Sequence, residues 1–144
     1  MSQEVVSIKR QGPVIDLDLE SSALGQIHFD MRALPEHEQT GSAQKLLAAS
    51  ALHCYTASLD RAMQIRGCTY GSITGEAIVT AGKDEHNRGR ILGIVLNVTV
   101  QIRQEHRELF ERIKKIMSKG CLVTASLTTS FPVTYNLHGK PFVE

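Results

Sequence analysis

Residues 42–66 read SAQKLLAASALHCYTASLDRAMQIR, and this stretch predicts one long helix that decides the fold. Large apolar side chains recur at steps of three or four, which is the spacing of one helical face. That face comprises Leu52, Tyr55, Leu59 and Met63. Ser42 is suited to cap the first turn, and Gly67 is suited to end the last one. Because many other positions hold Ala or Ser, we expect backbone to pack closely against this helix.

Two long strands follow the helix, at residues 69–81 and 91–102. The second strand has an apolar side chain at every even position from 92 to 102. These are Leu92, Ile94, Leu96, Val98, Val100 and Ile102. Such alternation is typical of a strand with one buried face, and the charged, glycine-flanked loop at 82–90 favours an antiparallel hairpin.

A second, amphipathic helix is predicted at residues 104–119. Its apolar stripe consists of Leu109, Ile113, Ile116 and Met117, with Phe110 beside it. Gly120 is suited to end this helix. Cys121 follows at once and leads into a short helical piece at 122–127. The pattern predicts a last strand at 131–137 and a turn at 138–141.

The N-terminal part predicts three short strands, at residues 4–9, 14–19 and 23–31, and then a polar loop at 32–40. Few of the strand–helix–strand units in this order are suited to parallel pairing. The fold class is therefore α+β with antiparallel sheets, rather than a doubly wound parallel sheet. The length of 144 residues fits a single domain spanning 1–144.

Composition excludes several classes of function. With 16 basic and 15 acidic residues the net charge is +1, and aromatic residues make up 5% with no Trp, so we expect no nucleic-acid partner. No apolar run reaches the roughly 18 residues of a spanning helix, and the N-terminus does not resemble a signal peptide. We therefore expect a cytoplasmic protein with no membrane partner. The His, Cys and carboxylate spacings do not indicate a metal site.

The three cysteines differ in their surroundings, and three is too few for a disulfide scaffold. Cys54 lies within the apolar helix, where a buried Cys ordinarily packs as a small hydrophobic residue. Cys121 precedes a helical turn, whose free amides would stabilise a thiolate and lower the pKa of the thiol. Cys68 lies at the start of a strand with no clear cationic partner, which favours a packing role.

Two segments resemble a known family. LLAASALHC at 46–54 resembles the Cys-bearing helix of the OsmC/organic hydroperoxide resistance (Ohr) family, and CLVTASL at 121–127 resembles its second Cys motif. The two cysteines are 67 positions apart (121 minus 54), with the expected hairpin and amphipathic helix between them. The resemblance covers roughly residues 41–137.

The resemblance implies an OsmC-like fold with a long central Cys-bearing helix, in an intertwined homodimer with sites at the subunit interface. It implies an antioxidant, stress-response peroxidase for organic hydroperoxides. Cys54 would be the peroxidatic thiol and Cys121 the resolving thiol, joined in a transient disulfide. An external dithiol reductant would reopen that disulfide. No bound cofactor is implied.

The family pairs its peroxidatic Cys with an Arg from the N-terminal strands and a Glu near the start of the Cys helix. Arg10, followed by Gln11 and Gly12, resembles the family's Arg-x-Gly turn and is the candidate cation. Gln44, ten residues before Cys54, stands where the carboxylate would be expected. Gln44 can hydrogen-bond a substrate oxygen, but it cannot hold a guanidinium by charge.

This departure keeps a second function open, namely an OsmC-like dimer that binds a small molecule or senses redox state with little peroxidase turnover. A third interpretation sets the family aside and takes a long helix wrapped by antiparallel strands as a hot-dog-like acyl-thioester hydrolase. That enzyme would need a carboxylate on the helix. Asp60 is the only acid between residues 42 and 66, and it lies far from the helix start.

Overall fold

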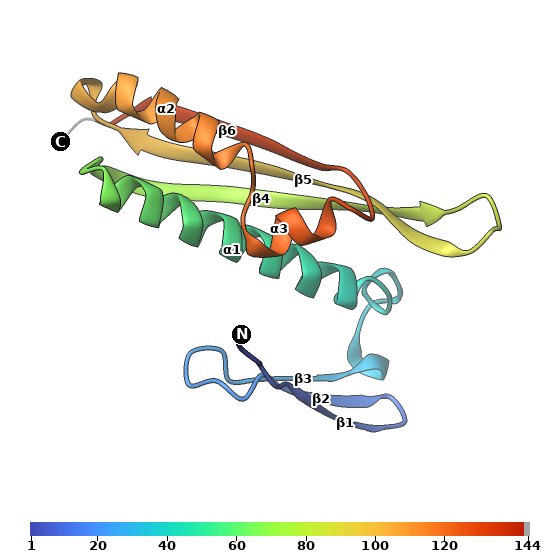
Figure 1. Cartoon of the computed structure of the whole chain (residues 1–144). Helices are drawn as coiled ribbons and strands as arrows, with labels where there is room; N and C mark the ends of the chain where they lie inside the picture. Colours follow the sequence, from blue (N-terminus) through green and yellow to red (C-terminus); the bar gives the residue numbers. More distant parts are fainter. Residues whose placement is uncertain (143–144) are drawn as a thin grey trace. The chain divides into compact units, whose positions relative to one another are not determined.

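The N-terminal part of the chain forms a small antiparallel sheet. The computed structural model describes residues 1–142 and divides the chain into two compact units, Met1–Ser42 and Ala43–Glu144. In the first unit the strand order is β1-β2-β3 (Figure 1), with β1 (Ser7–Gln11), β2 (Val14–Asp18) and β3 (Gln26–Asp30). A single domain over 1–144 stays a prediction, and its last two positions lie outside the described residues.

The three predicted N-terminal strands are present, although β1 begins three residues later than predicted. Val6 and Ile8 are both exposed, so this sheet does not bury them within the chain. The predicted loop at 32–40 contains two short 3-10 helices, η1 (Met31–Ala33) and η2 (Glu36–Glu38). Asp30 accepts a hydrogen bond from the amide of Arg32 and so caps η1.

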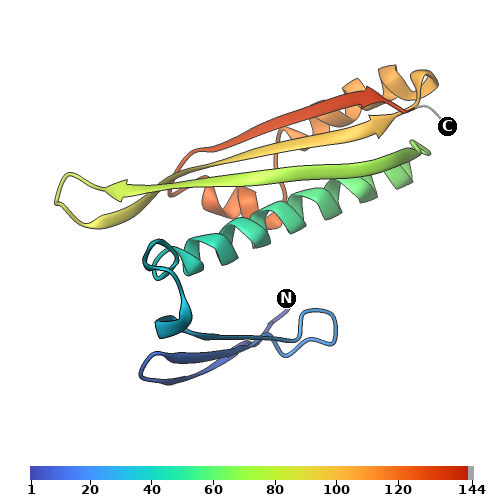
Figure 2. The same ribbon diagram turned by 180° about the vertical axis from the view of Figure 1, so that it is seen from behind.

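The second unit is a three-stranded sheet with helices on one face. The predicted helix is confirmed as α1 (Ser42–Ile65), which runs along the length of the sheet (Figures 1 and 2). Gly67 ends it with φ +68°. The amide of Gly67 donates to the Gln64 carbonyl at 3.1 Å and that of Cys68 to the Met63 carbonyl at 2.9 Å, which is a Schellman ending.

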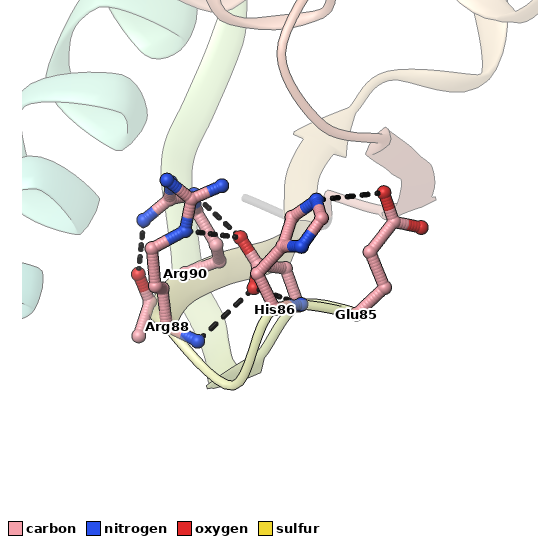
Figure 3. Close-up of polar contacts among 6 residues, drawn as sticks. Glu85, His86, Arg88 and Arg90 are labelled. Carbon is pink, nitrogen blue, oxygen red and sulfur yellow. Dashed lines mark hydrogen bonds and ion pairs between the residues drawn. The ribbon is translucent and has the colours of Figure 1, made fainter.

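The predicted antiparallel hairpin is confirmed, with β4 (Tyr70–Lys83) paired to β5 (Gly89–Ile102). Asp84 organises its tip, because its carboxylate accepts the amides of His86 at 2.8 Å and Arg88 at 3.0 Å. Arg88 and Arg90 place their Nε atoms 3.5 and 3.4 Å from the same carboxylate (Figure 3). These exposed pairs fix the shape of the loop more than they stabilise the fold.

The last strand differs from the prediction in extent and direction. β6 (Val133–Pro141) includes residues 138–141, so the predicted tail turn is wrong. β6 pairs with β5 in parallel, in the sheet order β4-β5-β6, so the sheets are not all antiparallel. The chain between them is long enough to cross the sheet, since it forms η3 (Gln104–His106), α2 (Arg107–Met117) and α3 (Leu122–Leu127). No helix among residues 1–142 is long and apolar enough to span a membrane.

The core of the second unit lies between β5 and the helices. The predicted alternation of β5 is confirmed from Ile94 to Ile102, whereas Leu92 is exposed. These side chains pack against α1 and α2 through Tyr55, Leu59, Met63, Phe110, Ile113 and Met117. Phe110 replaces the predicted Ile116 on the buried stripe of α2. Cys54 lies at the margin of the buried face of α1 and is half-buried.

Candidate functional site

The structure brings Cys54 and Cys121 together. Cys54 comes from the middle of α1, and Cys121 is the N-cap residue of α3, which lies beside α1 (Figures 1 and 2). Gly120 has φ +77° and turns the chain between α2 and this cap. The two sulfurs are close enough for each to shift the pKa of the other. Both thiols are free.

The first turn of α3 directs hydrogen-bond donors at both sulfurs. The amides of Leu122 and Val123 donate toward the Cys54 sulfur. The Cys121 sulfur receives the amides of Val123 and Thr124, and its Sγ lies 3.3 Å from the Thr124 hydroxyl. Thr124 in turn accepts the Cys121 amide at 2.9 Å, which completes a capping box. This arrangement stabilises negative charge on sulfur, which is the form of cysteine that attacks electrophiles.

The two thiols ionise differently. Burial raises the pKa of Cys54, and the hydrogen bond that it donates to Cys121 raises that pKa further. Burial is also the largest influence on Cys121, but the hydrogen bonds from Cys54 and Thr124 together outweigh it and lower the pKa of Cys121. The lowered pKa is the direction predicted from the helix N-terminus. Negative charge therefore forms first on Cys121.

Cys68 is separate in character from this pair. It is buried in the apolar core directly after Gly67, and burial raises the pKa of its thiol. A buried thiol with a raised pKa is a poor nucleophile. The packing role predicted for Cys68 is consistent with these surroundings.

Gln44 does not reach Cys54 of its own chain, and Arg10 belongs to the other compact unit. Arg10 lies on exposed β1 in the N-terminal unit, where its Nε donates to the Gly12 carbonyl at 3.3 Å. Gln44 lies in the first turn of α1, and ten helical residues place it about 15 Å along the axis from Cys54. At that position Gln44 lines a cavity of about 440 Å³, together with residues that include Leu47 and Arg90.

Sequence reasoning missed three polar residues around the pair. Thr124 follows Cys121 at the spacing of a capping box, and that spacing was the available signal. Tyr55 and Tyr135 stack on each other with ring centroids 5.3 Å apart, a contact between distant segments that no local pattern indicates. Among residues 1–142, no group of three or more His, Cys, Asp or Glu side chains is placed to hold a metal ion.

Residues 36–136 match the OsmC-like protein family, and the chain belongs to that family. A search of curated proteins finds no match. Among solved structures, an OsmC-like protein of unknown function from Vibrio cholerae superimposes with a TM-score of 0.75 at 12% identity, covering 95% of this chain and 99% of the other.

Two further similar structures are organic hydroperoxide resistance proteins. That of Elizabethkingia anophelis has a TM-score of 0.66 at 13% identity and covers 99% of this chain and 98% of its own. OhrB of Bacillus subtilis has a TM-score of 0.64 at 19% identity, with 96% and 98% covered. At these identities the similarity shows a shared fold.

Proposed function

We propose that the protein is a thiol-dependent peroxidase for organic hydroperoxides. The observation that carries the proposal is the interacting pair of Cys54 and Cys121 at the N-terminus of α3. Family membership and the organic hydroperoxide resistance proteins of the same fold support it.

In the first step the Cys54 thiolate attacks the O–O bond of the hydroperoxide. A sulfur–oxygen bond forms, and the alcohol leaves with a proton, so that Cys54 becomes a sulfenic acid. The Cys121 sulfur then attacks the Cys54 sulfur and displaces water, which leaves a disulfide. An external dithiol reduces that disulfide by exchange. The reaction needs no bound cofactor.

A cation has to complete this site, because the pKa of Cys54 is raised in its present surroundings. Arg10 is the candidate. We infer a homodimer with its sites at the subunit interface, since apolar side chains including Val6, Ile8 and Ile78 are exposed. Leu122, which is 80% exposed beside the Cys pair, also fits a buried interface. In such a dimer Gln44 would serve the site of the other subunit, because Cys54 of its own chain is out of reach.

The direct test is to find which thiols a hydroperoxide links. One equivalent of an alkyl hydroperoxide is expected to remove two thiols per chain. Mass spectrometry of the digested protein should show the Cys54 and Cys121 peptides joined and Cys68 free. A bridge that contains Cys68, or unchanged thiols after several equivalents, would contradict the proposal. Within this proposal the protein acts in the cytoplasm as an antioxidant of the stress response.

The second candidate function is a binding or redox-sensing dimer with little turnover, and the observation that favours it is Gln44 in place of a carboxylate. Gln44→Glu restores a charge able to hold Arg10. For a working peroxidase we expect the turnover rate to rise by less than about tenfold, or 1.4 kcal/mol in the barrier. A rise of about a hundredfold or more would favour the second function. The exposed Gln3→Glu adds the same charge elsewhere and is the control.

A further inference from the structure

Two buried tyrosine hydroxyls beside the Cys pair have no hydrogen-bond partner. The rings of Tyr55 and Tyr135 stack with an interplanar angle of 15°. Tyr55 is 1% exposed, and the Oη atoms of both residues are buried and unpaired among the described residues. Burying an unpaired hydroxyl destabilises the folded state, so such groups call for an explanation.

The Tyr135 hydroxyl lies next to the residues that hold Cys121. A Cβ placed on Gly120 would lie 2.3 Å from Tyr135 Oη and 2.6 Å from Thr124 Oγ1, so the two oxygens meet over the same small residue. Thr124 Oγ1 is itself 3.3 Å from the Cys121 sulfur. Tyr135 and Thr124 therefore both lie beside the turn that leads into Cys121, although their hydroxyls are not hydrogen-bonded to each other in the resting structure.

Tyr55 is linked to Cys121 through charge. Burial raises the pKa of Tyr55 to about 12, and the charges of Tyr135 and Cys121 act in the same direction. The phenol thus keeps its proton at neutral pH and remains a hydrogen-bond donor. An adjacent sulfur that becomes anionic is the acceptor that such a donor lacks in the resting structure.

Both tyrosines also line a cavity of about 280 Å³ between α2 and β6. Apart from Leu137, the other residues that line this cavity are polar or charged. They are Lys114, Ser118, Asn136 and His138. Lys114 and His138 also line a neighbouring cavity of about 440 Å³, so the tyrosine pair lies between Cys121 and a polar hollow able to hold water. Among the described residues, the charged and titratable groups placed beside the pair are Lys114 from α2, Cys121 and His138.

We propose that the stacked Tyr55 and Tyr135 hydroxyls form a proton relay between the Cys121 sulfur and this cavity. The inference rests on the proposed function for its role in the cycle. When the disulfide forms, the relay accepts the proton of Cys121, and when the disulfide opens, it supplies one.

The exposures of the two sulfurs set the direction of reduction. Cys121 is only 7% exposed, whereas Cys54 is half-buried and open to a reductant. The reductant thiolate bonds to the Cys54 sulfur, the S–S bond breaks, and its electron pair goes to Cys121. The relay then protonates the Cys121 thiolate and regains a proton from water in the cavity. A leaving thiolate of lower pKa departs faster, which agrees with the hydrogen bonds to Cys121.

Tyr135→Phe tests the relay by removing one hydroxyl. The disulfide is formed with diamide, a thiol oxidant, so that the test does not depend on peroxidase activity. We expect the variant to melt at the same temperature or higher, since it loses an unpaired buried hydroxyl. The rate of disulfide reduction by dithiothreitol should fall about tenfold or more. After correction for the thiolate fraction of the reductant, that rate should fall with rising pH only in the variant.

Tyr70→Phe is the matched control, because the Tyr70 hydroxyl donates to Asp60 and should not affect the rate. Tyr55→Phe repeats the test if Tyr135→Phe does not fold. Reduction at the parent rate with the parent pH profile would overturn the relay, as would failure of both Phe variants to fold, which would assign the hydroxyls a structural role. If diamide links the cysteines and hydroperoxide does not, the proposed function fails and the relay is still tested.

Discussion

The Cys54→Ser protein is expected to lose hydroperoxide turnover by at least about a thousandfold, which corresponds to roughly 4 kcal/mol of transition-state stabilisation. A Ser hydroxyl stays protonated near neutral pH and does not form the sulfenic acid that the reaction requires. The α3 amides that donate to the Cys54 sulfur cannot compensate, because they stabilise charge that Ser does not carry. The measurement is consumption of an alkyl hydroperoxide with excess dithiothreitol.

The other two cysteines supply the comparison. Cys121→Ser should still react once and then hold a sulfenic acid on Cys54, which a dimedone adduct on the Cys54 peptide would report. Cys68→Ser should turn over like the parent, since Cys68 is buried in the core with a raised pKa. If Cys54→Ser keeps the parent rate, or forms its sulfenic acid on Cys121, the assignment of Cys54 as the attacking thiol is wrong.

The elements that the sequence predicts well are those whose pattern is local. The spacing of Tyr55, Leu59 and Met63 determined which face of α1 is buried, and the alternation from Ile94 to Ile102 did the same for β5. The position of Cys121 as a helix N-cap could also be predicted, because Gly120 before it ends one helix and begins the turn into the next. In each case a few neighbouring residues determine the backbone.

What the sequence did not predict depends on pairing between distant segments. Residues 138–141 contain Gly139 and Pro141, which favour a turn locally, yet they extend β6 because β5 offers a parallel partner. The stacking of Tyr55 on Tyr135 joins α1 to β6 in the same way. The raised pKa of Cys54 follows from burial and from Cys121, and neither is encoded by spacing along α1.

Gly120→Ala is expected to be the most destabilising single change near the site. Gly120 has φ +77°, where an L-residue is strained by about 1–2 kcal/mol. Its new Cβ would also lie 2.3 Å from Tyr135 Oη and 2.6 Å from Thr124 Oγ1. Relieving such contacts in a packed region costs about 1–3 kcal/mol more. We therefore expect urea denaturation to show a total loss of about 2–5 kcal/mol in the free energy of unfolding.

Gly67→Ala separates the two causes. Gly67 has φ +68°, close to that of Gly120, but a Cβ there would meet no atom within 4 Å. It carries the backbone strain alone, and we expect it to cost about 1–2 kcal/mol. The excess loss in Gly120→Ala measures the contact with Tyr135 and Thr124. Because those two residues adjoin Cys121, the same variant should form the Cys54–Cys121 disulfide more slowly with diamide. Equal losses of unfolding free energy in the two variants would show that the side chains around Gly120 move to accept the new Cβ. The Tyr135 hydroxyl would then not be held against the turn before Cys121.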